Sequence, residues 1–254
     1  MFFREVFFMA FLLSLSVLEY EKNIEGNAGT IDLLIPHADY LHIDIMRKPF
    51  TEKDRFSEDS MEKLWDRFFK KISFDFHIMA YEPEKMIEKI NGIVDGRYRK
   101  KCFVTVHAEA YRNAFPELGE FTAKDYDIVS EFRSIDRKCK EKIADAMKSA
   151  RESGYKYGYA LEPGTSLNNI YGGTENADMI LLMAVNSGKG GQLFIDITDK
   201  IKEASNKYCV QVDGGINDKT IKNVIDAGTK NIVIGSYITA SENPVEAIKK
   251  IRQR

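Results

Sequence analysis

The chain has 254 residues, of which 44% are hydrophobic, 30% charged and 11% aromatic. This apolar content suffices for a substantial core and excludes a disordered, collagen-like or low-complexity chain. Lys and Arg number 37 against 39 Asp and Glu, and the formal net charge of −2 argues against nucleic acid as a partner. The three cysteines, Cys102, Cys139 and Cys209, are odd in number and lack metal-like spacing, which favours a reducing, cytoplasmic setting over a disulfide scaffold.

Two interpretations fit the apolar N-terminal residues 1–17, which carry a single cation, Arg4. One is a signal peptide, although no A-x-A-like cleavage site follows and the run is short for a membrane span. The other, which we favour, is a buried first strand, because a parallel strand covered on both faces reads as a continuous apolar run. Met9 offers a second possible start, so the sequence leaves open whether residues 1–8 belong to the natural protein.

Seven more short apolar runs follow, at residues 38–46, 72–79, 101–106, 155–161, 178–185, 208–213 and 231–236. Amphipathic stretches between them, notably residues 83–93, 137–153 and 217–227, predict helices, the last with Asn217 as N-cap and Gly228 as its end. Eight strand–helix units in about 250 residues predict an α/β fold of the (β/α)8 TIM barrel type. A doubly wound open sheet is the alternative, but no Gly-rich turn follows the first run.

Residues 111–140 break this rhythm, because they are charged, poorly periodic and contain Pro116 and Gly119. We predict an insertion there, part helix and part loop, after the fourth strand. The rest shows no repeat and no second domain, so residues 1–254 are expected to form one barrel domain. The charged C-terminal residues 246–254 are expected to be the solvated face of a last helix.

Four polar residues lie at the ends of predicted strands, where burial without a partner is costly. His42 and Asp44 are two apart and therefore share a face of one strand, while His77 ends the next strand and Asp213 the seventh. In a barrel these strand ends meet at one rim. A single strand histidine is more often a hydrogen-bonded core residue, but two imidazoles and two carboxylates together suit a divalent metal.

Three sets of small residues follow the last three predicted strands: Gly188, Lys189, Gly190 and Gly191; Gly214 and Gly215; Gly235 and Ser236. Glycine allows a phosphate to approach backbone N–H groups, and barrels often place a phosphate site after strands seven and eight. Each set alone is typical of a turn, but three in succession favour a phosphate site. Lys189 could add charge to it or point to solvent.

Three methionines, Met46, Met79 and Met183, lie at or near the same strand ends. From the residues alone, ordinary core filling is the better interpretation. The alternative is an apolar floor beneath a reacting carbon.

Seven segments occur in the order typical of one known family: HADYLHIDIM, FDFHIMAYEPEKMI, VTVHAEA, GYALEPGTSL, ADMILLMAVNSGKGGQLF, VQVDGGINDKTIKNVIDAG and IVIGS. Over nearly the whole chain they resemble the ribulose-phosphate 3-epimerase family, which includes a related epimerase of allulose 6-phosphate. The resemblance implies a barrel of the ribulose-phosphate-binding type with one divalent metal, zinc or iron(II) first and manganese or cobalt next. The implied metal ligands are His42, Asp44, His77 and Asp213.

The resemblance also implies the roles of the remaining site residues. Asp44 and Asp213 become the acid/base pair on opposite faces of the substrate's C3. A family serine that contacts substrate matches Ser16, with Ser14 as the second choice. The glycine turns become the phosphate site, and the three methionines become the apolar floor. His107 and Glu109 are expected to support the site from the same rim.

The implied reaction is C3 epimerisation of D-ribulose 5-phosphate to D-xylulose 5-phosphate, through a metal-stabilised enediolate, by a cytoplasmic homo-oligomer of pentose phosphate metabolism. Alternatives are the same chemistry on a hexulose 6-phosphate such as allulose 6-phosphate, or a non-catalytic barrel that binds sugar phosphates. Decarboxylation is disfavoured because no D-x-K-x-x-D string occurs. Neither nucleic acid nor membrane is expected as a partner.

The chain departs from the family pattern around the substrate. Met46 is followed by Arg47, Lys48, Pro49 and Phe50, where the family has a different loop over the substrate. Ser187 replaces a usual proline, Lys189 an aromatic residue, and Glu162 a common asparagine. The metal and acid/base residues are therefore intact, whereas the shell that selects the substrate is altered.

Overall fold

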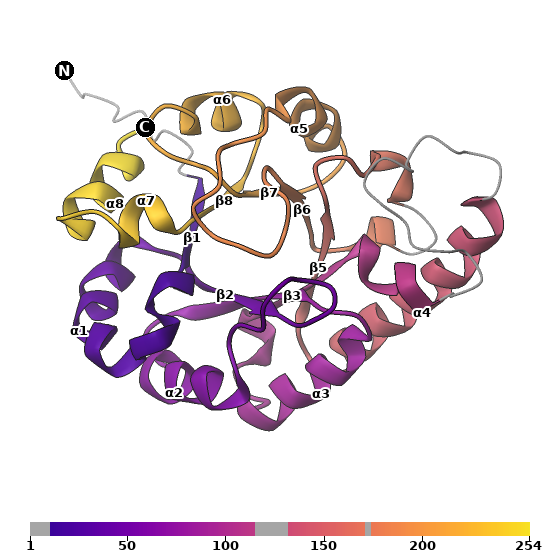
Figure 1. Cartoon of the computed structure of the whole chain (residues 1–254), viewed down its shortest axis with the longest axis horizontal. Coiled ribbons are helices and arrows are strands. Elements are labelled where there is room, and N and C mark those ends of the chain that lie inside the picture. The colour runs from indigo at the N-terminus through magenta and orange to yellow at the C-terminus, as the bar shows by residue number, and fades with distance from the viewer. Residues whose placement is uncertain (1–10, 115–131, 171–173) are drawn as a thin grey trace, which may run out of the picture.

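A computed structural model describes residues 11–114, 132–170 and 174–254, and its strands close into a barrel (Figure 1). Each strand pairs in parallel with the next in chain order, and β8 pairs with β1. The eight strands are β1 (Leu12–Ser16), β2 (Tyr40–Met46), β3 (Ser73–Met79), β4 (Phe103–His107), β5 (Lys156–Leu161), β6 (Met179–Met183), β7 (Val210–Asp213) and β8 (Asn231–Ile234). The predicted (β/α)8 barrel is confirmed, and the open-sheet alternative is wrong.

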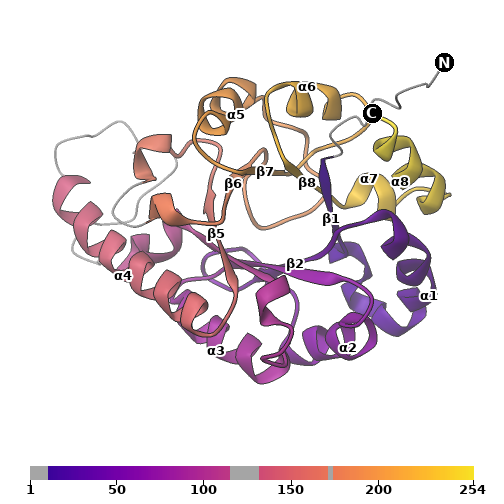
Figure 2. The ribbon, with the colours of Figure 1, turned by 180° about the vertical axis from the view of Figure 1, so that it is seen from behind.

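Helices surround the barrel, as the view from behind in Figure 2 also shows. They are α1 (Ile24–Leu34), α2 (Glu58–Phe68), α3 (Pro83–Ile93), α4 (Phe132–Glu152), α5 (Thr198–Ser205), α6 (Ile221–Asp226), α7 (Ser236–Thr239) and α8 (Pro244–Arg252). In α2, the buried residues Met61, Leu64, Trp65 and Phe68 recur at helical spacing and form the face toward the sheet. Ser57 caps this helix by accepting the backbone N–H of Ser60. Within the described ranges, none of these helices is long and apolar enough to cross a bilayer.

One predicted helix boundary is wrong. The helix expected over residues 217–227 begins only at Ile221. The Asn217 side chain accepts the backbone N–H groups of Lys219 and Thr220, and its backbone oxygen accepts that of Ile221, so Asn217 closes the turn that leads into the helix. Its end is as predicted, since Gly228 follows with a φ of +106°.

Two other expectations fall partly on residues that the structure does not describe. The first strand is confirmed as β1, while residues 1–10 lie outside the described ranges. The predicted insertion at residues 111–140 mostly lies outside them too, since residues 115–131 are not described. The 3-10 helix η4 (Ala108–Ala114) precedes this gap and α4 follows it.

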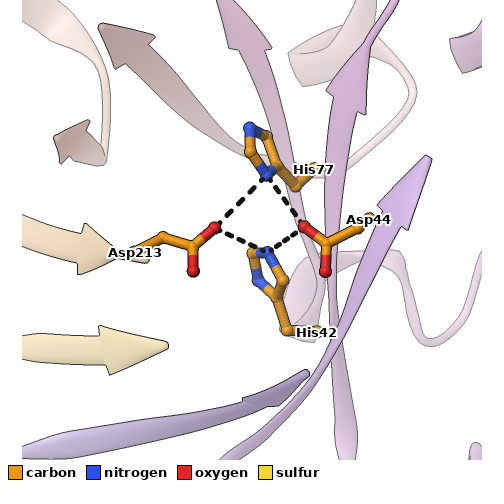
Figure 3. Close-up of side chains that lie close together, drawn as sticks. All are labelled: His42, Asp44, His77 and Asp213. Carbon is orange, nitrogen blue, oxygen red and sulfur yellow. Dashed lines mark hydrogen bonds and ion pairs between the residues drawn. The ribbon is translucent and has the colours of Figure 1, made fainter. Parts of the chain in front are cut away.

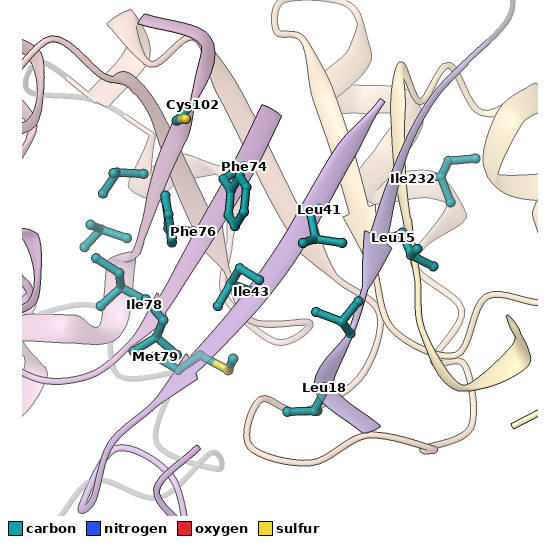
Figure 4. Packing of buried hydrophobic residues seen from close by; sticks show 14 of the residues in the cluster. Leu15, Leu18, Leu41, Ile43, Phe74, Phe76, Ile78, Met79, Cys102 and Ile232 are labelled. Carbon is teal, nitrogen blue, oxygen red and sulfur yellow. The ribbon is translucent and has the colours of Figure 1, made fainter. Parts of the chain in front are cut away.

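Side-chain alternation along the strands separates an apolar outer layer from a polar interior. In β3, Phe74 points out and packs on Trp65 of α2 with ring centroids 5.2 Å apart, within the cluster drawn in Figure 4. Asp75 and His77, on the opposite face of the same strand, point into the barrel and are fully buried. Register therefore decides which residues can meet inside: β2 and β3 pair so that Asp44 lies opposite His77.

Candidate active site

Four side chains from three strands converge at the carboxyl end of the barrel interior (Figure 3). Asp44 Oδ1 lies 3.2 Å from His42 Nε2 and 3.3 Å from His77 Nδ1. Across from it, Asp213 Oδ2 lies 4.0 Å from the same His42 nitrogen and 3.9 Å from the same His77 nitrogen. One ligand atom from each residue falls within 4.8 Å of all the others. The four residues predicted as metal ligands are thus brought together.

The chemistry of this cluster fits a divalent cation. Two imidazole nitrogens and two carboxylates form a donor set that zinc, iron and similar metals accept. His42 Nδ1 lies 2.8 Å from Asp75 Oδ2, whereas the buried His42 Nε2 makes no hydrogen bond even though Asp44 Oδ1 is 3.2 Å away. A buried polar atom of this kind calls for a ligand, and a cation would also relieve the repulsion between the two carboxylates.

The surroundings drive the pKa values of the two aspartates apart. Burial tends to raise the pKa of Asp44, but its contacts with His42 and His77 outweigh burial and hold that pKa well below its usual value. Burial and the charge of Asp44 together raise the pKa of Asp213 to about 7. Burial lowers the pKa of His77 to about 4, so this imidazole is neutral. Two neighbouring carboxyls with separated pKa values are a pattern typical of an acid and a base in one site.

A pocket opens directly above the cluster. Both aspartates line it, whereas His42 and His77 lie beneath it and are fully buried. All other residues predicted for the site also line it: Ser16, Met46, Met79, Met183, Gly188, Lys189, Gly190, Gly191, Gly214, Gly215, Gly235 and Ser236. Sequence reasoning missed Glu19, Asn186 and Gln192, which share the pocket. Their place just after strand ends was the available signal.

The two serines of the first strand have different partners. Ser16 Oγ donates a hydrogen bond of 2.7 Å to Asp44 Oδ2 at the pocket. Ser14 lies below the pocket, where its hydroxyl oxygen is 3.2 Å from Asp75 Oδ2 and 3.3 Å from Asn231 Oδ1. The geometry therefore favours Ser16 over Ser14 as the residue near a bound molecule.

Glycine turns line the opposite wall of the pocket. Gly214 and Gly215 have φ values of +109° and +65°, which other residues rarely adopt. A Cβ atom on Gly215 would lie 2.4 Å from the backbone nitrogen of Phe194, so a side chain does not fit there. Exposed N–H groups in turns of this kind suit an anion. Among the described residues that line the pocket, Lys189 is the one Lys or Arg, and it is exposed.

The loop after β2 carries cations that do not line the pocket. The Arg47 guanidinium donates to the backbone oxygens of Met46, Arg55 and Phe56, so it holds the loop together. Lys48 is exposed. The loop instead places the centroid of the Phe50 ring 5.2 Å from that of His107, which in turn contacts His77 of the four-residue cluster.

Comparisons with known proteins agree on one family. The family model described as "Ribulose-phosphate 3 epimerase family" matches residues 120–239. The ribulose-phosphate 3-epimerase of Schizosaccharomyces pombe is 30% identical over 235 residues, 91% of this chain and 87% of that protein. The enzyme of the same name from Bacillus subtilis is 29% identical over 224 residues, 85% of this chain and 86% of that protein.

Solved structures show the same barrel with distant sequences. A 3-hexulose-6-phosphate synthase from Salmonella typhimurium superposes with a TM-score of 0.64 at 15% identity, covering 95% of this chain and 97% of its own. KGPDC from Streptococcus mutans gives 0.62 at 11% identity, with 96% of each chain covered. At such identities the likeness shows the fold alone.

Proposed function

Because this chain belongs to the ribulose-phosphate 3-epimerase family, and is thus a carbohydrate epimerase, we propose that it interconverts D-ribulose 5-phosphate and D-xylulose 5-phosphate at C3. The observation that carries the proposal is the convergence of two imidazoles and two carboxylates on one point beneath a pocket walled by glycine turns. The proposed ligands of one divalent metal ion are His42, Asp44, His77 and Asp213.

Zinc or iron(II) suits these donors best, with manganese and cobalt as alternatives. When bound, the ion would act as a Lewis acid that stabilises the negative charge developing on the substrate oxygens. The loss of a proton next to a ketone places this negative charge on the carbonyl oxygen. The side chains around the ion then need only transfer protons.

Two aspartates carry the proton transfers. Asp44, whose pKa is low, takes the C3 proton on one face of the substrate, and the C–H electron pair passes to the C2 carbonyl oxygen as an enediolate. Asp213 returns a proton to C3 from the opposite face, a proton that it takes up by exchange or keeps from the previous turnover. The roles exchange in the reverse direction. Ser16 orients Asp44 through its hydrogen bond to Oδ2.

The remaining residues position the substrate. Backbone N–H groups of the turns at residues 188–191, 214–215 and 235–236 would hold the phosphate, with Lys189 adding charge. Binding energy from this remote group aligns C3 between the two aspartates. The side chains of Met46, Met79 and Met183 would form the apolar floor under the carbon chain.

A six-carbon ketose phosphate such as allulose 6-phosphate is the second candidate substrate. The loop after β2 motivates it, because residues 47–50 depart from the family pattern over the substrate. A barrel that only binds sugar phosphates is the third candidate, although it would have no need of two carboxylates at one metal. We further propose a single-domain, cytoplasmic homo-oligomer without nucleic-acid or membrane partners, to be tested by limited proteolysis and analytical ultracentrifugation.

A proton NMR time course in D2O tests the function. Protein loaded separately with zinc, iron(II) or manganese would receive ribulose 5-phosphate or allulose 6-phosphate, with Asp213→Asn as the inactive variant. Asp199→Asn is the matched control, because that carboxylate is exposed on α5. We expect solvent deuterium at C3 of ribulose 5-phosphate, lost only in Asp213→Asn. Exchange with the hexulose alone would support the second candidate, and metal and sugar binding without exchange the third.

A further inference from the structure

A buried chain of polar side chains leads from His77 through His107 to Glu109. His77 Nε2 lies 2.7 Å from His107 Nε2, and the two rings stack with centroids 4.9 Å apart and planes 20° from parallel. Both residues are fully buried. Since His77 Nδ1 faces the two aspartates, the two nitrogens of this ring have entirely different partners.

Glu109 fixes the far end of this chain. Its Oε2 lies 3.2 Å from His107 Nδ1, and its Oε1 accepts hydrogen bonds from the Thr165 hydroxyl and from the backbone N–H of Glu162. Burial raises the pKa of Glu109, but the hydrogen bonds from His107 and Thr165 outweigh burial and keep the pKa below its usual value. An ionised carboxylate can only accept hydrogen bonds, so it requires a proton on His107 Nδ1.

The remaining protons follow from the proposed metal site, because a neutral imidazole carries one N–H and one lone pair. Only Nδ1 of His77 faces Asp44 and Asp213, so a metal there would take the lone pair of Nδ1 and leave the proton of this ring on Nε2. His107 Nε2, 2.7 Å away, must then accept that proton, since two facing nitrogens need one proton between them. The proton of His107 itself then lies on Nδ1, toward Glu109.

We propose that Glu109 and His107 are positioning residues that select the tautomer of His77 able to bind the metal through Nδ1. The inference rests on the proposed function, since it concerns the metal site assigned there. His107 does not touch the reacting atoms and acts only through His77. Ligand histidines commonly depend on such outer partners for their orientation and basicity.

The other histidine of the cluster shows the same logic with the nitrogens reversed. A metal bound through His42 Nε2 would place the proton of that ring on Nδ1, 2.8 Å from Asp75 Oδ2. Thus the tautomer of His42 is selected directly by the Asp75 carboxylate. The tautomer of His77 is selected by the Glu109 carboxylate acting through His107. The Phe50 ring packs against the ring of His107, with centroids 5.2 Å apart, on one side of the His77–His107–Glu109 chain.

The decisive measurements are the ring-nitrogen NMR signals of 15N-histidine protein and the dissociation constant of zinc, measured by chelator competition. In wild-type protein loaded with zinc we expect His77 to be bound through Nδ1 and His107 to carry its proton on Nδ1. His107→Phe removes the acceptor and should weaken zinc binding by about 10- to 100-fold. His107→Gln, whose amide both accepts and donates, should recover most of that loss.

His37→Gln is the matched control, because His37 lies outside the cluster and should bind zinc like the wild type. Thermal melts confirm that each variant folds. A proton on Nε2 of wild-type His107, a doubly protonated His107, or unchanged zinc affinity in a folded His107→Phe would overturn the inference. If the wild type bound no metal at all, the proposed function would fail together with this inference. If the wild type bound zinc but the His107 results disagreed, only this inference would fail.

Discussion

The two halves of the barrel mouth are built on different principles. On the side of β2 and β3, charged and polar side chains project from the strands, and His42, Asp75 and His77 are fully buried. On the side of β6 to β8, glycine turns present bare main chain, and Lys189 is exposed. A cation needs a few directed ligands at set positions, whereas a phosphate can be held by many N–H groups. The comparison predicts that the two halves respond differently to substitution.

The largest effect is expected on the side-chain half. Asp44→Asn leaves an amide that cannot take the C3 proton, so kcat for ribulose 5-phosphate should fall by about 10²- to 10⁴-fold. Binding of inorganic phosphate, measured by calorimetry, should stay close to the wild-type value because the glycine half is untouched. Asp199→Asn serves again as control. An equal loss of phosphate binding and turnover would erase the distinction between the halves.

The next effect belongs to the main-chain half. In Gly215→Ala the new Cβ would meet Phe194 at 2.4 Å from its backbone nitrogen and 2.6 Å from its Cα, which forces the turn to move. We expect KM to rise more than kcat falls, with about 1–3 kcal/mol lost from the free energy of unfolding in urea.

Gly191→Ala is the matched comparison for that variant. Gly191 also has a positive φ, +71°, but no atom lies within 4 Å of an added Cβ. Both variants therefore carry backbone strain, and only Gly215→Ala adds a collision. Similar KM values for the two would show that the close approach of Gly215 to Phe194 has no bearing on binding.

A smaller effect is expected from the one cation among the described residues of the pocket wall. Lys189→Met should raise KM by no more than about fivefold, since exposed ion pairs contribute roughly 0.2–1 kcal/mol. The difference from wild type should shrink as salt is added, because screening weakens exposed charges. A KM that stays unchanged at low salt would mean that Lys189 points to solvent and that backbone alone holds the phosphate.

The smallest effect concerns stability and pH. Burial raises the pKa of Glu162 above the usual 4.5, with His107 only partly opposing. The stabilising contribution of this group is complete below about pH 4.5 and is lost as pH rises through the folded-state pKa. Glu162→Gln does not titrate, and its amide oxygen can still accept the N–H of Ser187. Urea unfolding should therefore show the variant gaining stability relative to wild type as pH rises above about 4.5. A pH-independent difference would contradict this.

Much of the site could be predicted because the spacing of residues along a strand determines the face on which each side chain lies. His42 and Asp44 share a face by their spacing, and the carboxyl ends of parallel strands must meet at one rim. The choice between Ser16 and Ser14 was different, since both share that same face. Only the depth of each along the barrel, seen in the hydrogen bond from Ser16 to Asp44, separates them. The helix after Asn217 begins later than predicted for a local reason, because an Asx turn and a helix cap use the same side-chain acceptor.

The amino-acid sequence by itself determined the barrel, the family and the four metal-binding candidates, because each depends on residue type and spacing within a strand or turn. Only the tertiary structure decided which nitrogen of His77 faces the aspartates and that His107 backs it, since β3 and β4 must pair before the two rings can stack. It also decided that Arg47 binds its own loop and not the pocket. A long side chain can reach several partners from distant parts of the sequence, and which of them lie within reach is determined only by the folded structure.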